Sequence, residues 1–306
     1  MSHTLEEIIK TPEILKRLDE KNIILNKNKK YLFVGCGSSY NLGLISKVML
    51  NENGYNAEVK TGGNVLLFDL KEKYDEAILF TRTGTSTETV KAAKKLKKQG
   101  IKTLGITVYD ETPIVKECDE SIVIDFAQEE SVVMTGSFVF MIAMILRAIK
   151  KEDYYEESIK LIKKSKEIIT KDFVKNIDHF VFLGFNENFG VSKEGALKLQ
   201  EMAIQRVEYH EPLEYRHGPK STVGPKSLVV LNSKNTDFEE KLMEEMKELG
   251  AKTLIIGENG DIDITDMEGF EAPLRMIPLQ YLGYIKAKEQ GLNPDKPQNL
   301  SKSVIL

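Results

Sequence analysis

The sequence predicts an α/β protein built on parallel sheets, and three observations support this class. Short apolar runs typical of buried strands recur along the chain. Between them lie segments whose apolar residues repeat at helical spacing. Strands that alternate with helices of about 10 to 15 residues indicate a parallel sheet covered by helices on both faces. The pattern then restarts near residue 180, which indicates duplication of one α/β unit and not a short-period repeat.

The elements of the first half can be assigned in order. Thr4 followed by Glu7 is a capping-box pattern, so residues 4–21 are expected to form one or two short helices. The strands are expected at residues 31–34, 57–59, 77–80, 103–108 and 121–124, and helices at 42–51, 88–99 and 138–146.

The second half repeats this order after a connecting segment. Residues 150–176 are rich in Lys and Glu, with isoleucines at helical spacing, and are expected to form a helical bridge. Strands are then expected at 180–188 (with its turn), 227–233 and 253–256, and helices at 191–204 and 238–249. We therefore place the two domains at residues 1–155 and 156–306.

Composition excludes several classes of protein. The 306 residues are 41% hydrophobic and 29% charged, which is typical of a soluble globular protein, and a net charge of -4 disfavours nucleic acid as a partner. The longest apolar run, 138–146, is shorter than the about 20 residues of a membrane span. The acidic N-terminus, with Glu6, is not a signal peptide. Cys36 and Cys118 lack disulfide or zinc spacing, so a cytoplasmic location is expected.

The most informative stretch is Thr81-Arg82-Thr83-Gly84-Thr85-Ser86-Thr87, which we call the hydroxyl turn. It lies between a predicted strand and a predicted helix. A helix N-terminus exposes unpaired N–H groups and a positive partial charge, so hydroxyls gathered there can bind an anion such as phosphate. The simpler interpretation is a helix cap, which needs only one hydroxyl, whereas five are present.

Two further turns carry hydroxyls, Ser38-Ser39 and residues 134–137, which include Thr135. In a doubly wound sheet, turns at the carboxyl ends of strands converge on one crevice. The three turns would then surround one phosphate. The alternative is three unrelated helix caps.

One predicted helix carries Glu194, Lys198 and Glu201 at positions i, i+4 and i+7, which places acid, base and acid on one face. Such a face is usually solvated and linked by salt bridges. If it faced a cleft instead, a glutamate beside a lysine could act as a general base.

Two candidate groups lie on irregular segments. Glycine and proline after His217 force a turn, and functional residues concentrate on such loops. A metal site made by His210 and His217 is disfavoured because their spacing matches no helical pair. The apolar chain end, residues 304–306, suggests a docked tail that would hold Lys302 in place.

Taken together, these segments resemble the sugar isomerase (SIS) domain proteins, above all the isomerase half of glucosamine-6-phosphate synthase and stand-alone glucosamine-6-phosphate deaminases. The resemblance covers nearly the whole chain and implies two tandem doubly wound, flavodoxin-like parallel-sheet SIS domains. The motifs that carry it are Cys36-Gly37-Ser38-Ser39-Tyr40, residues 81–86, residues 194–201, Arg216-His217-Gly218-Pro219 and residues 296–304.

The resemblance implies a role for each site residue. The sugar phosphate is expected at Ser38, Ser39, Thr81, Arg82, Thr83 and Ser86, with Thr135 lining the same pocket. Glu201 would move a proton between C1 and C2, His217 would help to open the sugar ring, and Lys302 could form a Schiff base. Lys198 matches a lysine of the same active-site helix. The family usually forms dimers, so we expect a homodimer whose active site lies near the interface and receives the His217 loop from the partner.

Two departures from the synthase affect the expected function. Arg82 stands where the synthase has glutamine, and an extra guanidinium should tighten phosphate binding. We expect no glutaminase domain before residue 1, because Ser2 is not the N-terminal cysteine that such a domain needs, and glutamine is therefore not the expected nitrogen source. Residues 129–137 also look more like the stand-alone deaminases and deglycases.

The sequence therefore predicts an amino-sugar-phosphate deaminase/isomerase that converts glucosamine-6-phosphate and water to fructose-6-phosphate and ammonia. This chemistry requires no redox cofactor and no metal. The alternatives are a fructosamine-6-phosphate deglycase, another phosphosugar aldose-ketose isomerase, or a non-enzymatic phosphosugar sensor. Such sensors usually carry a helix-turn-helix, for which residues 1–30 are too few and too weakly basic. The choice between gluco and galacto substrates and the physiological direction stay open.

Overall fold

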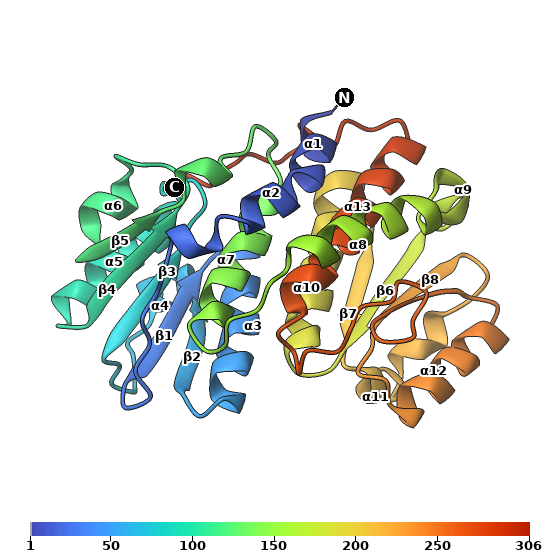
Figure 1. Ribbon diagram of the computed structural model, residues 1–306, viewed down its shortest axis with the longest axis horizontal. Coiled ribbons are helices and arrows are strands. Elements are labelled where there is room, and N and C mark those ends of the chain that lie inside the picture. The colour runs from blue at the N-terminus through green and yellow to red at the C-terminus, as the bar shows by residue number, and fades with distance from the viewer. Residues whose placement is uncertain (1) are drawn as a thin grey trace.

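The computed structural model describes residues 2–306 and contains two parallel sheets with a layer of helices between them (Figure 1). The first sheet has the order β2-β1-β3-β4-β5 and the second the order β7-β6-β8-β9, and all strand pairs are parallel. The predicted α/β class with parallel sheets is confirmed. The strands are β1 (Lys30–Gly35), β2 (Asn56–Thr61), β3 (Glu76–Phe80), β4 (Lys102–Thr107), β5 (Glu120–Val123), β6 (His179–Gly184), β7 (Val207–His210), β8 (Ser227–Asn232) and β9 (Lys252–Ile256).

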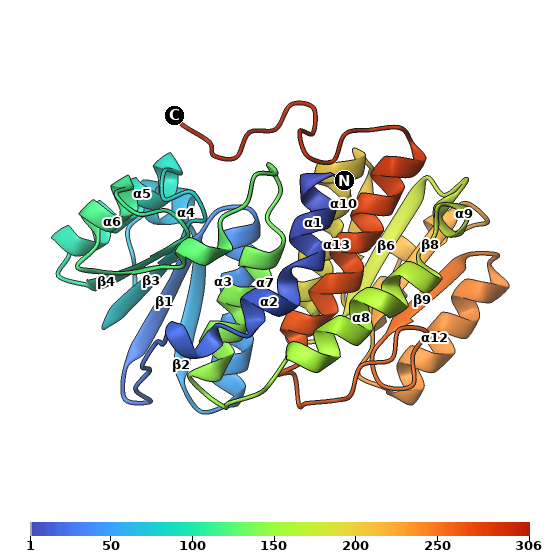
Figure 2. The same ribbon diagram turned by 45° about the horizontal axis from the view of Figure 1, so that its top comes forward.

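The helices either form the central layer or cover the outer faces of the sheets. Figure 2 shows α3, α7, α10 and α13 between the two sheets, with α5 and α12 on opposite outer sides. The helices are α1 (His3–Ile9), α2 (Thr11–Leu15), α3 (Ser38–Glu52), α4 (Gly62–Leu67), α5 (Thr87–Lys98), α6 (Pro113–Glu117), α7 (Gly136–Arg147), α8 (Tyr155–Ile168), α9 (Lys171–Val174), α10 (Glu187–Ala203), α11 (Pro212–Tyr215), α12 (Asp237–Glu248) and α13 (Ala272–Glu289), with short 3-10 turns at Leu18–Glu20, Asp125–Ala127 and Pro219–Thr222.

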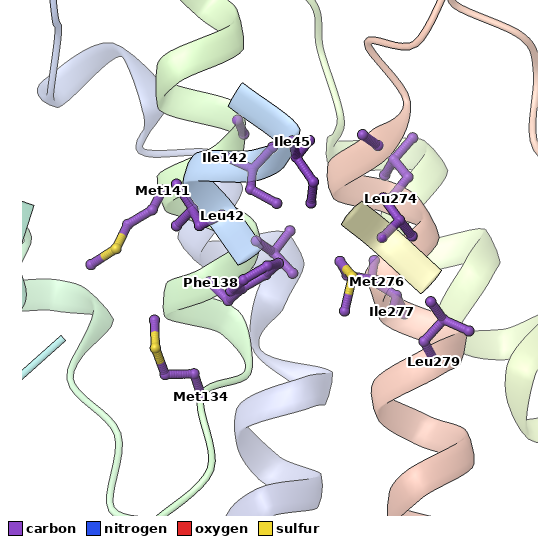
Figure 3. Packing of buried hydrophobic residues seen from close by; sticks show 14 of the residues in the cluster. Leu42, Ile45, Met134, Phe138, Met141, Ile142, Leu274, Met276, Ile277 and Leu279 are labelled. Carbon is purple, nitrogen blue, oxygen red and sulfur yellow. The ribbon is translucent and has the colours of Figure 1, made fainter. Parts of the chain in front are cut away.

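The main hydrophobic core lies in the central layer and continues into both sheets. The predicted apolar helix becomes α7, in which every residue from Gly136 to Leu146 is buried. Its Phe138 and Ile142 point towards Leu42 and Ile45 of α3 in the close view of Figure 3. Because large apolar side chains fill this layer, the two sheets share one core rather than standing as separate bodies.

The longest helix, α13, is absent from the expected elements. Its residues from Ala272 to Ala287 are all buried, so it has no polar face to produce an amphipathic pattern. Pro278 lies inside it, and an internal proline ordinarily argues against a helix. The short edge strand β7 is also absent from the expected elements, because the alternation in its four residues, Val-Glu-Tyr-His, is too short to stand out.

The first turn of each sheet has the same backbone conformation. Gly37, before α3, has φ 56° and ψ -126°, and Asn186, before α10, has φ 49° and ψ -124°. Helix and strand also approach equally closely in both halves: a Cβ on Gly35 would lie 2.5 Å from Ser39, and one on Gly184 would lie 2.3 Å from Asn188. The two halves thus share strand order and local turn geometry. None of the helices within residues 2–306 has the length and apolar character needed to cross a membrane.

Candidate functional site

A pocket lies at the carboxyl ends of the strands of the first sheet and brings together segments that are far apart in the sequence. Turns after β1 and β3, the loop before α7, the end of α10 and the C-terminal tail all contribute to it. Its lining comprises Cys36, Gly37, Ser38, Ser39, Arg82, Thr83, Ser86, Glu88, Val132, Met134, Glu201 and residues 300–304. The predicted convergence at one crevice is therefore present for the hydroxyl turn and for Ser38-Ser39.

The sequence-predicted residues divide into two groups. Seven of them line the pocket: Ser38, Ser39, Arg82, Thr83, Ser86, Glu201 and Lys302. Four do not line it: Thr81, Thr135, Lys198 and His217.

The C-terminal tail lies across the hydroxyl turn. The Thr85 hydroxyl donates to Ser303 Oγ at 3.0 Å, and the Thr87 N–H donates to the Val304 carbonyl at 3.1 Å. The tail is thus docked, as expected, but by polar contacts. The apolar side chains of Ile305 and Leu306 are 79% and 77% exposed, so their burial is not what docks the tail.

Arg82 does not contribute a free positive charge to the pocket. Its side chain is buried, and its Nη1 lies 3.0 Å from Glu129 Oε2. The guanidinium also donates to the carbonyl oxygens of Ser131 at 3.3 Å and Val132 at 2.5 Å. The expectation of a more cationic cradle is therefore corrected, because a buried carboxylate compensates the guanidinium where it stands.

Thr135 is held by the same carboxylate. Its N–H and its hydroxyl both donate to Glu129 Oε1 at 2.9 Å, and its side chain is fully buried. This corrects the expectation that Thr135 lines the pocket. Thr81 is also buried, and its hydroxyl has no hydrogen-bond partner within the described residues.

The acid, base and acid face of α10 is buried, so the solvated interpretation of its spacing is wrong. Lys198 is fully buried, and its Nζ lies 3.2 Å from Glu194 Oε1 and 2.5 Å from Glu201 Oε2. It also donates to Ser38 Oγ at 3.0 Å. Burial alone would lower the pKa of Lys198, but the two carboxylates outweigh this effect and raise the pKa above its ordinary value.

Of these three side chains, only Glu201 reaches the pocket, with 17% of its side chain exposed. Glu194 is fully buried and accepts a hydrogen bond from Asn41 at 2.8 Å, and burial raises its pKa. Lys198 therefore lies behind Glu201 as a charged support, outside the lining of the pocket, and its expected catalytic role stays a prediction.

Lys302 and His217 have different settings. Lys302 lines the pocket, and its Nζ donates to the carbonyl oxygen of Glu129 at 2.7 Å. His217 is exposed on the turn after α11 and lies outside the lining of this pocket. Its expected contribution across a dimer interface stays a prediction.

Sequence reasoning missed Glu129 and Glu88. A buried guanidinium requires a counter-ion, so an arginine next to a strand end was a signal that an acid had to lie nearby, although its position could not be read. Glu88, in the first turn of α5, lines the pocket, and one of its carboxylate oxygens is buried without a partner among residues 2–306.

Comparison with known proteins agrees with this fold. A family model described as the SIS domain matches residues 24–151. A crystal structure of glucosamine-6-phosphate deaminase from Thermotoga maritima superimposes with a TM-score of 0.90 at 38% sequence identity, covering 100% of both chains. The C-terminal domain of glucosamine-fructose-6-phosphate aminotransferase from Francisella tularensis has the same fold, with a TM-score of 0.81 at 23% identity over 97% of this chain and 98% of that one.

Curated relatives are glutamine-fructose-6-phosphate aminotransferases. That of Sulfolobus acidocaldarius is 25% identical over 99% of this chain and 54% of its own length, and that of Pyrococcus horikoshii is 26% identical over 99% and 57%. The chain thus spans about half the length of these relatives. The parallel-sheet α/β fold of this chain is shared with both solved structures. The chain belongs to the SIS domain family.

Proposed function

We propose that this protein is an amino-sugar-phosphate deaminase/isomerase that converts glucosamine-6-phosphate and water to fructose-6-phosphate and ammonia. The observation that carries the proposal is that Glu201, supported by a buried lysine, opens onto the same pocket as the hydroxyl turn. A proton-transfer group and an anion cradle in one pocket suit an aldose-ketose conversion of a phosphorylated sugar. The deaminase structure from Thermotoga maritima, at 38% identity, supports the amino sugar as substrate.

The phosphate would bind at the N-terminus of α5. Thr83 and Ser86, just before α5, line the pocket together with Ser39 of α3. They can donate to phosphate oxygens, and the positive end of the helix dipole adds to the attraction. Arg82, already neutralised by Glu129, would form part of the wall.

The bond changes would take place next to Glu201. In the open-chain sugar its carboxylate takes the proton from C2 and returns it to C1, while the C1 oxygen gains a proton and the C2 nitrogen loses one. The aldehyde thereby becomes a hydroxymethyl group and the C2 amine becomes an imine. Water adds to the imine, ammonia leaves, and the C2 ketone remains. The neighbouring Lys198 ammonium, 2.5 Å from Glu201 Oε2, would hold this carboxylate in position for the transfer. Lys302, at the pocket, could instead hold the ketose as a Schiff base.

The remaining predictions belong to the same proposal. Each sheet with its helices would be one SIS domain, divided near residue 155, because the halves share strand order and turn conformation. A second copy of the chain would supply His217, which is exposed and outside the pocket of its own chain, for ring opening.

The proposal is tested by measuring ammonia release from glucosamine-6-phosphate. Glu201→Gln should abolish it, because an amide cannot accept the C2 proton, whereas Glu244→Gln, on the exposed face of α12, should keep wild-type activity. Full activity of the Glu201 variant would contradict the assignment of the base. A parallel assay with galactosamine-, N-acetylglucosamine- and fructosamine-6-phosphate separates the deaminase from a deglycase or another isomerase. Binding of these sugars without turnover would identify a sensor.

A further inference from the structure

The carboxylate of Glu129 is the most densely hydrogen-bonded group around the pocket. It is 3% exposed and accepts from Arg82 Nη1 at 3.0 Å. It also accepts from the N–H and hydroxyl of Thr135 at 2.9 Å each, and from the N–H and hydroxyl of Ser137 at 3.0 and 2.7 Å. Five donors use the full accepting capacity of a carboxylate, so Glu129 is fixed in place.

Arg82 is fixed equally firmly. Its two terminal nitrogens donate to Glu129 and to the carbonyl oxygens of Ser131 and Val132. The guanidinium therefore faces a carboxylate and two carbonyl oxygens. A ligand in the pocket meets Arg82 as a neutralised wall and not as a free cation.

The segment that follows Glu129 connects this pair to the rest of the site. The Glu129 carbonyl accepts from Lys302, and the Val132 N–H donates to the Asp295 carbonyl at 3.1 Å. Glu7 of α1 accepts the N–H groups of Glu130 and Ser131 at 2.6 and 3.0 Å. Helix α1, the start of the tail, Lys302 and Arg82 are thus all held by residues 129–132.

We propose that Glu129 is a positioning residue that neutralises Arg82 and fixes it in the pocket wall, so that ligand phosphate is bound by the hydroxyl turn and not by the guanidinium. The proposal rests on the proposed function, since it concerns the same pocket. A free guanidinium would hold any phosphate tightly in a bidentate manner. Because Glu129 compensates the charge of the guanidinium, inorganic phosphate should bind weakly. Occupancy of the pocket by a sugar phosphate should then depend on contacts with the sugar.

Calorimetric titration with inorganic phosphate at fixed ionic strength tests this. In the double variant Arg82→Gln/Glu129→Gln, the two amides replace the ion pair, and the dissociation constant should stay within about threefold of wild type because no free charge is lost. A larger loss of affinity would show that the guanidinium binds phosphate and would overturn the proposal. The surface pair Lys102→Gln/Glu120→Gln is the matched control and should leave the affinity unchanged.

The single variant Glu129→Gln should increase the affinity for inorganic phosphate. It leaves Arg82 charged without a counter-ion, so phosphate should bind at least about threefold more tightly than to wild type. A purely structural role for Glu129 would not produce a gain in affinity, and a folded variant with equal or weaker binding would refute the proposal. If this variant does not fold, the double variant decides alone.

The two proposals can fail separately. Phosphate titration needs no turnover, so the expected affinities in a protein that releases no ammonia would overturn the deaminase function and support the role of Glu129. Ammonia release by wild type together with a large loss of phosphate affinity in the double variant would support the deaminase function and overturn the role of Glu129.

Discussion

Replacing Lys198 by methionine should destabilise the protein strongly. Within residues 2–306, Lys198 is the only cation that forms an ion pair with Glu194 and Glu201 of α10. At 3.2 and 2.5 Å, each attraction amounts to about 5 to 7 kcal/mol at an effective dielectric constant of about 20, before the cost of burial is subtracted. Measured losses on breaking one partner of a buried ion pair are about 3 to 5 kcal/mol. We therefore expect the free energy of unfolding to fall by about 3 to 5 kcal/mol.

The loss should depend on pH with a definite sign. Burial raises the pKa of Glu194 in the folded protein above its ordinary value. Without Lys198 the charged form of Glu194 has no counter-ion, so folding of the variant is favoured when Glu194 is protonated. The deficit relative to wild type should consequently shrink as the pH falls from about 7 to about 5.

Urea denaturation followed by circular dichroism at both pH values measures the effect. Lys193→Met on the same helix is the matched control, because Lys193 lies over the rings of Tyr40 and Tyr209 rather than beside a carboxylate. Its loss should be about 0.5 to 1 kcal/mol. A deficit for the Lys198 variant below about 1 kcal/mol, or one that is equal at both pH values, would refute the argument.

Two further predictions concern the core and the N-terminal helix. Phe138→Ala on α7 should lower the free energy of unfolding by about 3 to 5 kcal/mol, because it leaves a cavity in the central layer, and a loss under about 1 kcal/mol in chemical denaturation would contradict the packing. Burial and the neighbouring Glu129 raise the pKa of Glu7, so the stability that Glu7 contributes falls as pH rises through its folded pKa. Glu7→Gln removes this titration, and its free energy of unfolding relative to wild type should become more favourable between about pH 4.5 and pH 7, whereas a constant difference would exclude the raised pKa.

Much of the fold could be predicted because its signals are local. The strands β1, β3 and β8 are short apolar runs bounded by turns, and α5 and α12 each keep an apolar stripe for one sheet face. The helix α13 could not be predicted because a helix that is buried on all sides carries no stripe, and its Pro278 is tolerated only through surrounding packing.

For the site, the sequence determined which chemical groups exist and which of them share a turn or a helix face. The spacing of Glu194, Lys198 and Glu201 placed them together, but the same spacing fits a solvated face. Only the packing of α10 against α3 and α13 buried two of them and left Glu201 at the pocket. The ion pair between Arg82 and Glu129 likewise depends on tertiary structure, because it joins the turn after β3 to the loop before α7. Sequence spacing fixes neighbours along one element, whereas exposure and charge compensation depend on which elements pack together, and these decide how each group can act.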